Sequence, residues 1–80
     1  MRKDLKIIFS DDIKRIKKLK GSAKIIALKE LNEKIDTYMI AEDFAVYYPQ
    51  LYTPDTLNKI AKAKNSIEAD NIMTTLRRAM

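Results

Sequence analysis

The 80-residue sequence contains neither cysteine nor histidine. The lack of cysteine excludes disulfides, thiolate zinc sites and cysteine nucleophiles, and it is typical of proteins in the reducing cytoplasm. The lack of histidine removes the commonest general base, the commonest metal ligand and every serine–histidine triad. We therefore expect a cytoplasmic, non-enzymatic protein that has no catalytic residues and binds no metal or cofactor.

Glycine, proline and long apolar runs are also scarce. One glycine and two prolines leave few residues for tight hairpin turns, and Gly21 has no neighbouring glycine with which to build a phosphate-binding loop. The longest apolar run covers residues 44–48, whereas a transmembrane helix needs about 20 apolar residues. Because the common residue types favour helix, we expect an all-α domain over residues 1–80, a bundle of four to five short helices outside the membrane.

The net charge of +5 is unevenly distributed along the chain. Residues 1–29 carry ten basic and three acidic side chains, and residues 59–80 carry five and two. Residues 30–58 carry one basic and six acidic side chains. Two basic ends therefore flank an acidic middle, and this pattern indicates a charged binding partner more clearly than the total charge does.

Helix signals divide the first half of the chain into two segments. Ser10 is a suitable N-cap, the two aspartates after it suit a helix amino terminus, and Gly21 suits the residue just past a helix end. These signals predict a helix over residues 11–20. Ser22 is expected to cap a longer helix, whose core stripe has spacings of three and four: Ile25, Leu28, Leu31, Ile35, Tyr38 and Met39.

The second half contains two more predicted helices. Glu42 interrupts the apolar stripe, so a kink or a new short helix is expected near residues 40–43 before Pro49 stops the segment. The sequence Thr53-Pro54-Asp55 predicts a helix beginning at residue 54, with Asn65 as its left-handed C-cap. Ser66 begins the last helix, whose apolar arc consists of Ala69, Ile72, Met73, Leu76, Ala79 and Met80.

A cationic helix face is the strongest candidate for a binding surface. In a helix over residues 11–20 the basic side chains lie opposite the aliphatic ones. They form a cationic face of Lys14, Arg15, Lys17 and Lys18, and Lys20 and Lys24 follow closely in the chain. Such a face would neutralise several phosphates and release their counterions. The alternative interpretation is a solvated face that only keeps the protein soluble.

Residues 54–79 resemble the DNA-binding unit of helix-turn-helix proteins. The first helix of the pair displays Lys59 and Lys62, and one face of the second displays side chains that suit base and phosphate contacts: Asn71, Thr74, Thr75 and Arg78. The resemblance implies a recognition helix and favours DNA over RNA. The segment departs from the family pattern because Asn65 replaces the turn glycine and because Lys64 stands where an apolar residue is expected.

The amino-terminal part offers a rival resemblance, to ribbon-helix-helix repressors. Residues 4–9 alternate in a way that fits a short strand and equally the first turn of a helix. A strand here, a helix over 11–20, Gly21 and a second helix would imply a dimer that pairs two such strands. The first helix is about one turn too short and Ile8 is a poor DNA reader, so this fold ranks below the helical bundle.

The first interpretation of the aromatic residues in the acidic middle is core packing, and the second is a protein-binding surface. They would anchor a protein partner, as in an inhibitor or adaptor from a mobile element, through Phe44, Tyr47, Tyr48 and Tyr52. This hypothesis requires Tyr48 and Tyr52 to be solvent-accessible and clustered. The leading hypothesis remains a small nucleic-acid-binding regulator, expected to be a homodimer, that contacts the phosphate backbone.

Overall fold

The computed structural model describes residues 3–80, which form five helices and no strand: α1 (Lys3–Ile8), α2 (Ser10–Lys17), α3 (Gly21–Tyr47), α4 (Pro54–Ala61) and α5 (Ser66–Arg78). The predicted all-α bundle is confirmed for this part of the chain. Residues 4–9 are helical, so the strand that a ribbon-helix-helix fold needs is absent from the described residues.

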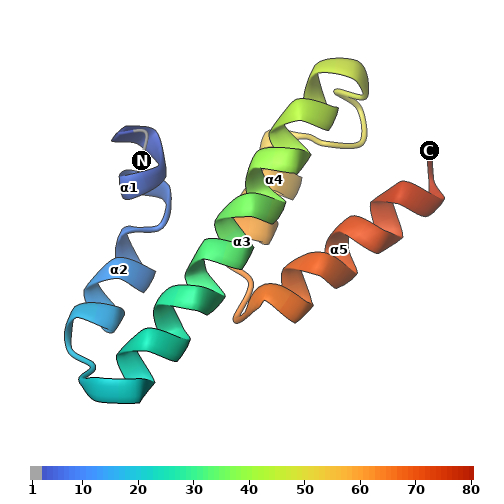
Figure 1. Ribbon diagram of the computed structural model, residues 1–80. Helices are drawn as coiled ribbons and strands as arrows, with labels where there is room; N and C mark the ends of the chain where they lie inside the picture. Colours follow the sequence, from blue (N-terminus) through green and yellow to red (C-terminus); the bar gives the residue numbers. More distant parts are fainter. Residues whose placement is uncertain (1–2) are drawn as a thin grey trace.

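α3 runs along the whole molecule, whose longest dimension is 41 Å. α1 and α2 lie on one flank of α3, α5 lies on the other flank, and α4 lies behind it (Figure 1). α3 packs against α2, α4 and α5. The front of α3 in this view is covered by no other described helix.

A single buried residue, Phe9, separates α1 from α2. Its ring packs edge-on against Tyr38 of α3, with 5.6 Å between the ring centroids. The N-cap position of α2 is Phe9, which has no side-chain oxygen to offer, and Ser10 is already inside the helix. The prediction that Ser10 caps this helix was therefore wrong, because burial of Phe9 decides where the chain bends.

Gly21 has a backbone φ of 64° and is the first residue of α3. This left-handed conformation strains every residue that carries a Cβ atom, and it allows the chain to reverse between α2 and α3. α2 ends at Lys17 and Lys20 is the N-cap residue of α3. The predicted helix end at residue 20 and the predicted cap at Ser22 were therefore misplaced, although the turn itself lies where the glycine indicated.

α3 continues without a break through residues 40–43, so the new helix expected there does not form. Helix propagation depends on backbone hydrogen bonds rather than on an unbroken apolar stripe, and Glu42 stays within the helix half-buried. The predicted stripe is confirmed in its centre, at Leu31, Ile35 and Tyr38, which are buried. Its other members, Ile25, Leu28 and Met39, are exposed.

The caps of α4 and α5 come from side chains directly before each helix. Thr53 Oγ1 accepts a hydrogen bond from the backbone N–H of Thr56 at 3.2 Å, as the Thr-Pro-Asp signal predicted. Asn65 Oδ1 accepts from the N–H of Glu68 at 2.9 Å, and its φ is −154°. Asn65 is thus the N-cap of α5 and not a left-handed C-cap of α4, which ends at Ala61.

Candidate functional site

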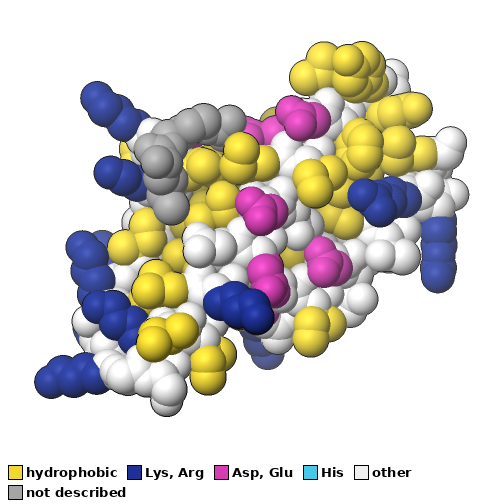
Figure 2. Space-filling view, in the orientation of Figure 1, with side chains coloured by type: hydrophobic (Ala, Val, Ile, Leu, Met, Phe, Trp, Pro, Cys, Tyr) yellow, Lys and Arg dark blue, Asp and Glu magenta, His cyan; other side chains and the backbone are white. Residues whose placement is uncertain are grey.

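The basic residues of α2 and of the start of α3 form one exposed surface, which we call the basic surface: Lys14, Arg15, Lys17, Lys18, Lys20 and Lys24. Between residues 13 and 29 the chain contains seven basic and no acidic side chains. In Figure 2, lysine and arginine side chains gather at this end of the molecule, at the lower left, while acidic side chains lie over its middle. The structure therefore keeps the charge segregation of the sequence.

The lysines of the basic surface have no acidic partners among residues 3–80. Arg15 pairs with Asp12 at 3.0 Å, whereas Lys14, Lys17 and Lys18 form no ion pair with a described residue. Lysines three and four positions apart on a helix repel each other and destabilise it by about 0.2–0.5 kcal/mol per pair. This uncompensated repulsion would be relieved by a bound polyanion.

Two further predicted contacts, Lys59 and Lys62, lie exposed on or just after α4. Lys62 borders a small hollow that Ile8 and Asp11 also line, so it lies beside the junction of α1 and α2. The structure thus brings Lys62 towards the amino-terminal helices, although acidic side chains lie next to it.

The polar face of α5 is exposed as predicted, at Asn71, Thr74, Thr75 and Arg78. Both threonine hydroxyls donate to backbone carbonyls one turn earlier, Thr74 to Asp70 at 2.9 Å and Thr75 to Asn71 at 3.0 Å. α5 and α2 lie on opposite flanks of α3 (Figure 1). The structure does not bring the polar face of α5 together with the basic surface.

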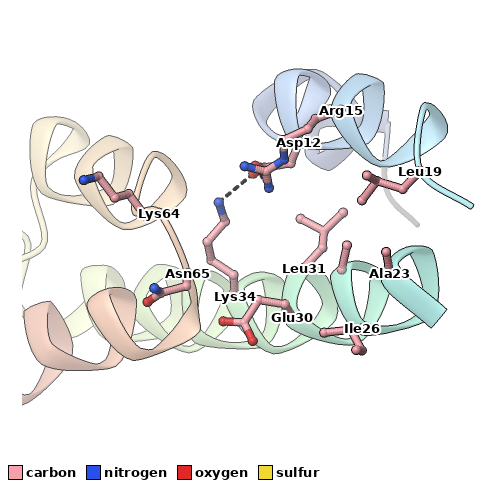
Figure 3. A pocket seen from close by; sticks show the side chains of 11 residues that line it. Asp12, Arg15, Leu19, Ala23, Ile26, Glu30, Leu31, Lys34, Lys64 and Asn65 are labelled. Atoms are coloured by element: carbon pink, nitrogen blue, oxygen red, sulfur yellow. Dashed lines mark hydrogen bonds and ion pairs between the residues drawn. The ribbon is translucent and has the colours of Figure 1, made fainter.

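A groove of about 390 Å³ opens between α2, the first half of α3 and the turn before α5 (Figure 3). Its wall is apolar and includes Leu19, Ala23, Ile26 and Leu31. The side chains at its rim are charged or polar and include Arg15, Glu30 and Lys64. Arg15 reaches over the groove from α2 in the close-up view. The groove adds an apolar floor next to the basic surface.

Lys34 is the charged residue that sequence analysis missed. Its side chain is buried, with the whole residue 3% exposed, and its Nζ donates to Asp12 Oδ2 at 2.6 Å and to the Ala63 carbonyl at 2.9 Å. The same Nζ lies 5.6 Å from the centre of the Phe9 ring. Lys34 therefore ties α2 and the turn after α4 to α3. The available signal was its spacing, three residues after Leu31 and four before Tyr38, two members of the predicted stripe.

The amino terminus of α5 is held by acidic side chains of α3. Glu30 Oε1 accepts a hydrogen bond from the Ser66 N–H, and Glu33 Oε2 accepts one from the Ser66 hydroxyl at 3.1 Å. The Ser66 side chain, its backbone N–H and the charge of Lys34 together hold the pKa of Glu30 below its ordinary value of 4.5, while desolvation opposes them. These carboxylates of the acidic middle have a structural role.

The aromatic cluster divides between core and surface. Tyr47 is 78% exposed and Tyr48 is also exposed, whereas Phe44 is half-buried. Tyr52 is only 2% exposed, and its hydroxyl donates to the sulfur of Met80 at 3.3 Å. Tyr52 therefore lacks the accessibility that the protein-partner hypothesis requires, because the loop after α3 folds this ring back against Phe44.

No family model, curated protein or solved structure matches this chain. Within residues 3–80, no helix combines the length and apolar character needed to cross a bilayer. The same part of the chain contains no group of three or more acidic side chains placed to hold a metal ion.

Proposed function

We propose that this protein is a non-enzymatic nucleic-acid-binding protein that contacts the phosphate backbone through the basic surface of α2 and the start of α3. The observation that carries the proposal is a row of exposed lysines without acidic partners at one end of the molecule. Each phosphate that a lysine neutralises releases condensed counterions, and this release is the main source of sequence-independent affinity.

Duplex DNA is the ligand that the arrangement of side chains favours. Proteins that bind single strands place aromatic rings along the basic track so that the bases stack on them. Here the exposed rings of Tyr47 and Tyr48 lie at the carboxyl end of α3, and the basic surface lies at its amino end. With a rise of about 1.5 Å per residue, about 35 Å of helix separates them. A rigid, densely charged duplex needs no stacking platform.

The polar face of α5 remains a second proposed contact, as a base reader. Its asparagine and arginine are exposed and have the chemistry for bidentate contacts with bases, at Asn71 and Arg78. Because α5 lies on the other flank of α3, we propose that it acts separately from the basic surface and contributes less affinity.

The test is fluorescence anisotropy of labelled duplex DNA, single-stranded DNA and RNA at several salt concentrations. We expect the duplex to bind best, with a log–log salt slope of about −0.9 per phosphate contacted. Reversal of one charge, Lys17→Glu, should weaken duplex binding by about tenfold at low salt and flatten the slope.

The matched control is Lys59→Glu, which makes the same charge change at an exposed lysine of α4. It should weaken binding less than Lys17→Glu, because a local surface and not the total charge makes the contact. Absence of binding to every probe at low salt, or equal losses in the two variants, would overturn the proposal.

An interaction with a protein is the second candidate function, favoured by the exposed aromatic pair at the end of α3. Tyr47→Ala/Tyr48→Ala would leave duplex binding intact if the basic surface acts alone. Loss of duplex binding in that variant would show that the two ends of α3 serve one ligand.

A further inference from the structure

Apolar side chains cover a wide arc of α3, and only part of this arc packs against the rest of the described chain. The packed part includes Leu31, Ile35 and Tyr38. An exposed row beside it has residues at seven-residue intervals, which we call the outer ridge: Ile25, Asn32, Met39 and Val46. Recurrence near seven residues keeps a stripe on one side of a helix.

The outer ridge is exposed along its whole length. Ile25 is 69% exposed, Val46 is 75% exposed, and Met39 is 40% exposed. Single hydrophobic residues on a surface are ordinary, but a row of them along one long helix marks an interaction site. The front of α3 lies open in Figure 1, and Figure 2 shows hydrophobic side chains among acidic ones over this part of the surface.

The charges beside the ridge indicate what covers it. Lys29, Asp36 and Asp43 follow one another at seven-residue intervals along one edge, and all three are exposed. In a parallel pair of α3 helices, each of these charged residues would lie beside the same residue of the other copy, so like charges would meet. Two antiparallel copies bring the lysine of the amino half beside an aspartate of the carboxyl half, so the edge is complementary to a second copy of itself only in the antiparallel arrangement.

We propose that the outer ridge from Ile25 to Met39 is the interface of a homodimer in which two α3 helices pack antiparallel, with Lys29 of each copy beside Asp36 of the other. A two-fold interface is isologous, so this ion pair occurs twice. The same register brings Ile25 of one copy next to Met39 of the other, and both side chains are exposed. Asn32 then lies next to the two-fold axis, where a polar residue in an apolar seam specifies the register.

This dimer would also position the two basic surfaces, a consequence that rests on the proposed function. In the stated register the two Gly21 residues lie about 35 Å apart along the helix pair. Their separation is close to the length of one turn of duplex DNA, about 34–36 Å.

Sedimentation equilibrium without nucleic acid tests the interface directly, with the complete chain and concentrations up to about 100 μM. The wild-type protein should be dimeric. Lys29→Glu and Asp36→Lys, each of which places two pairs of like charges in the interface, should each raise the dimer dissociation constant by about tenfold. The double variant restores opposite charges and should return within about threefold of wild type.

A monomeric wild-type protein would overturn the dimer, and equal dimerisation of all four proteins would overturn the antiparallel register. Met39→Glu gives a second test, because a charge in the middle of the ridge should abolish dimerisation while circular dichroism shows the same helix content. The control is Ile67→Glu, which alters an exposed isoleucine of α5 away from the ridge and should not change the dissociation constant.

The two proposals fail separately. Lys17→Glu should remain dimeric and lose duplex binding, whereas Met39→Glu should become monomeric and keep a weakened, salt-dependent affinity. A wild-type monomer that still binds DNA would overturn only the dimer. A wild-type dimer that binds no nucleic acid would overturn only the proposed function.

Discussion

The seam between α3 and α5 and the basic surface of α2 differ in how their charged groups are satisfied. At the seam, Glu30 and Glu33 accept hydrogen bonds from Ser66, and Asp70 accepts one from Thr37 at 2.9 Å. On the basic surface, no acidic side chain of residues 3–80 pairs with Lys14, Lys17 or Lys18. The acidic charges hold the fold together, and the basic charges remain available to a partner.

The largest effect expected from this difference concerns Lys34, a basic residue whose charge, like those at the seam, is paired within the fold. Lys34→Ala leaves the carboxylate of Asp12 and the carbonyl of Ala63 without their buried partner, and it should lower the free energy of unfolding by about 3 kcal/mol. Urea denaturation measures the loss. Lys18→Ala, on the basic surface, is the control and should change stability by less than about 0.5 kcal/mol. Similar losses of stability in both variants would show that paired and unpaired charges do not differ in their contribution to the fold.

A smaller effect is expected at the cap of α5. Asn65→Ala removes the side-chain oxygen that accepts from the Glu68 N–H, and should lower the free energy of unfolding by about 1 kcal/mol. Asn71→Ala on the exposed face of α5 is the matched control and should leave thermal stability unchanged. In DNA binding we expect the opposite pattern: Asn71→Ala should alter base preference, and Asn65→Ala should not. A stability loss at Asn71 would show that this face is structural.

Local signals in the sequence predicted those parts of the fold that neighbouring residues determine. The Thr53-Pro54-Asp55 cap is one example, because its hydrogen bond spans three residues. The boundary at Asn65 was misassigned, since an asparagine suits both a left-handed helix end and an N-cap, and the choice depends on the extended backbone there.

Long-range contacts explain what the sequence could not predict. Lys34 was not recognised as buried because its partners, Asp12 and Ala63, lie 22 and 29 residues away in the chain. The burial of Tyr52 depends on the tertiary fold in the same way, because the fold brings Met80 and Phe44 to this side chain. The lysines of the basic surface were predicted to be exposed because their helix has a clear amphipathic pattern.

The smallest effect is a pH dependence at the seam. Because its pKa is lowered in the folded protein, Glu30 stabilises the fold fully above pH 4.5, and this contribution is lost as the pH falls through the lower folded pKa. Glu30→Gln should therefore be less stable than wild type near neutral pH, and the difference should shrink below pH 4.5. Thermal unfolding across the acid range measures it. Ser66→Ala keeps the backbone N–H and loses the hydroxyl, so it should show part of the same change. A difference that is constant with pH would mean that the charge of Glu30 does not support α5, and that hydrogen bonding alone holds the seam.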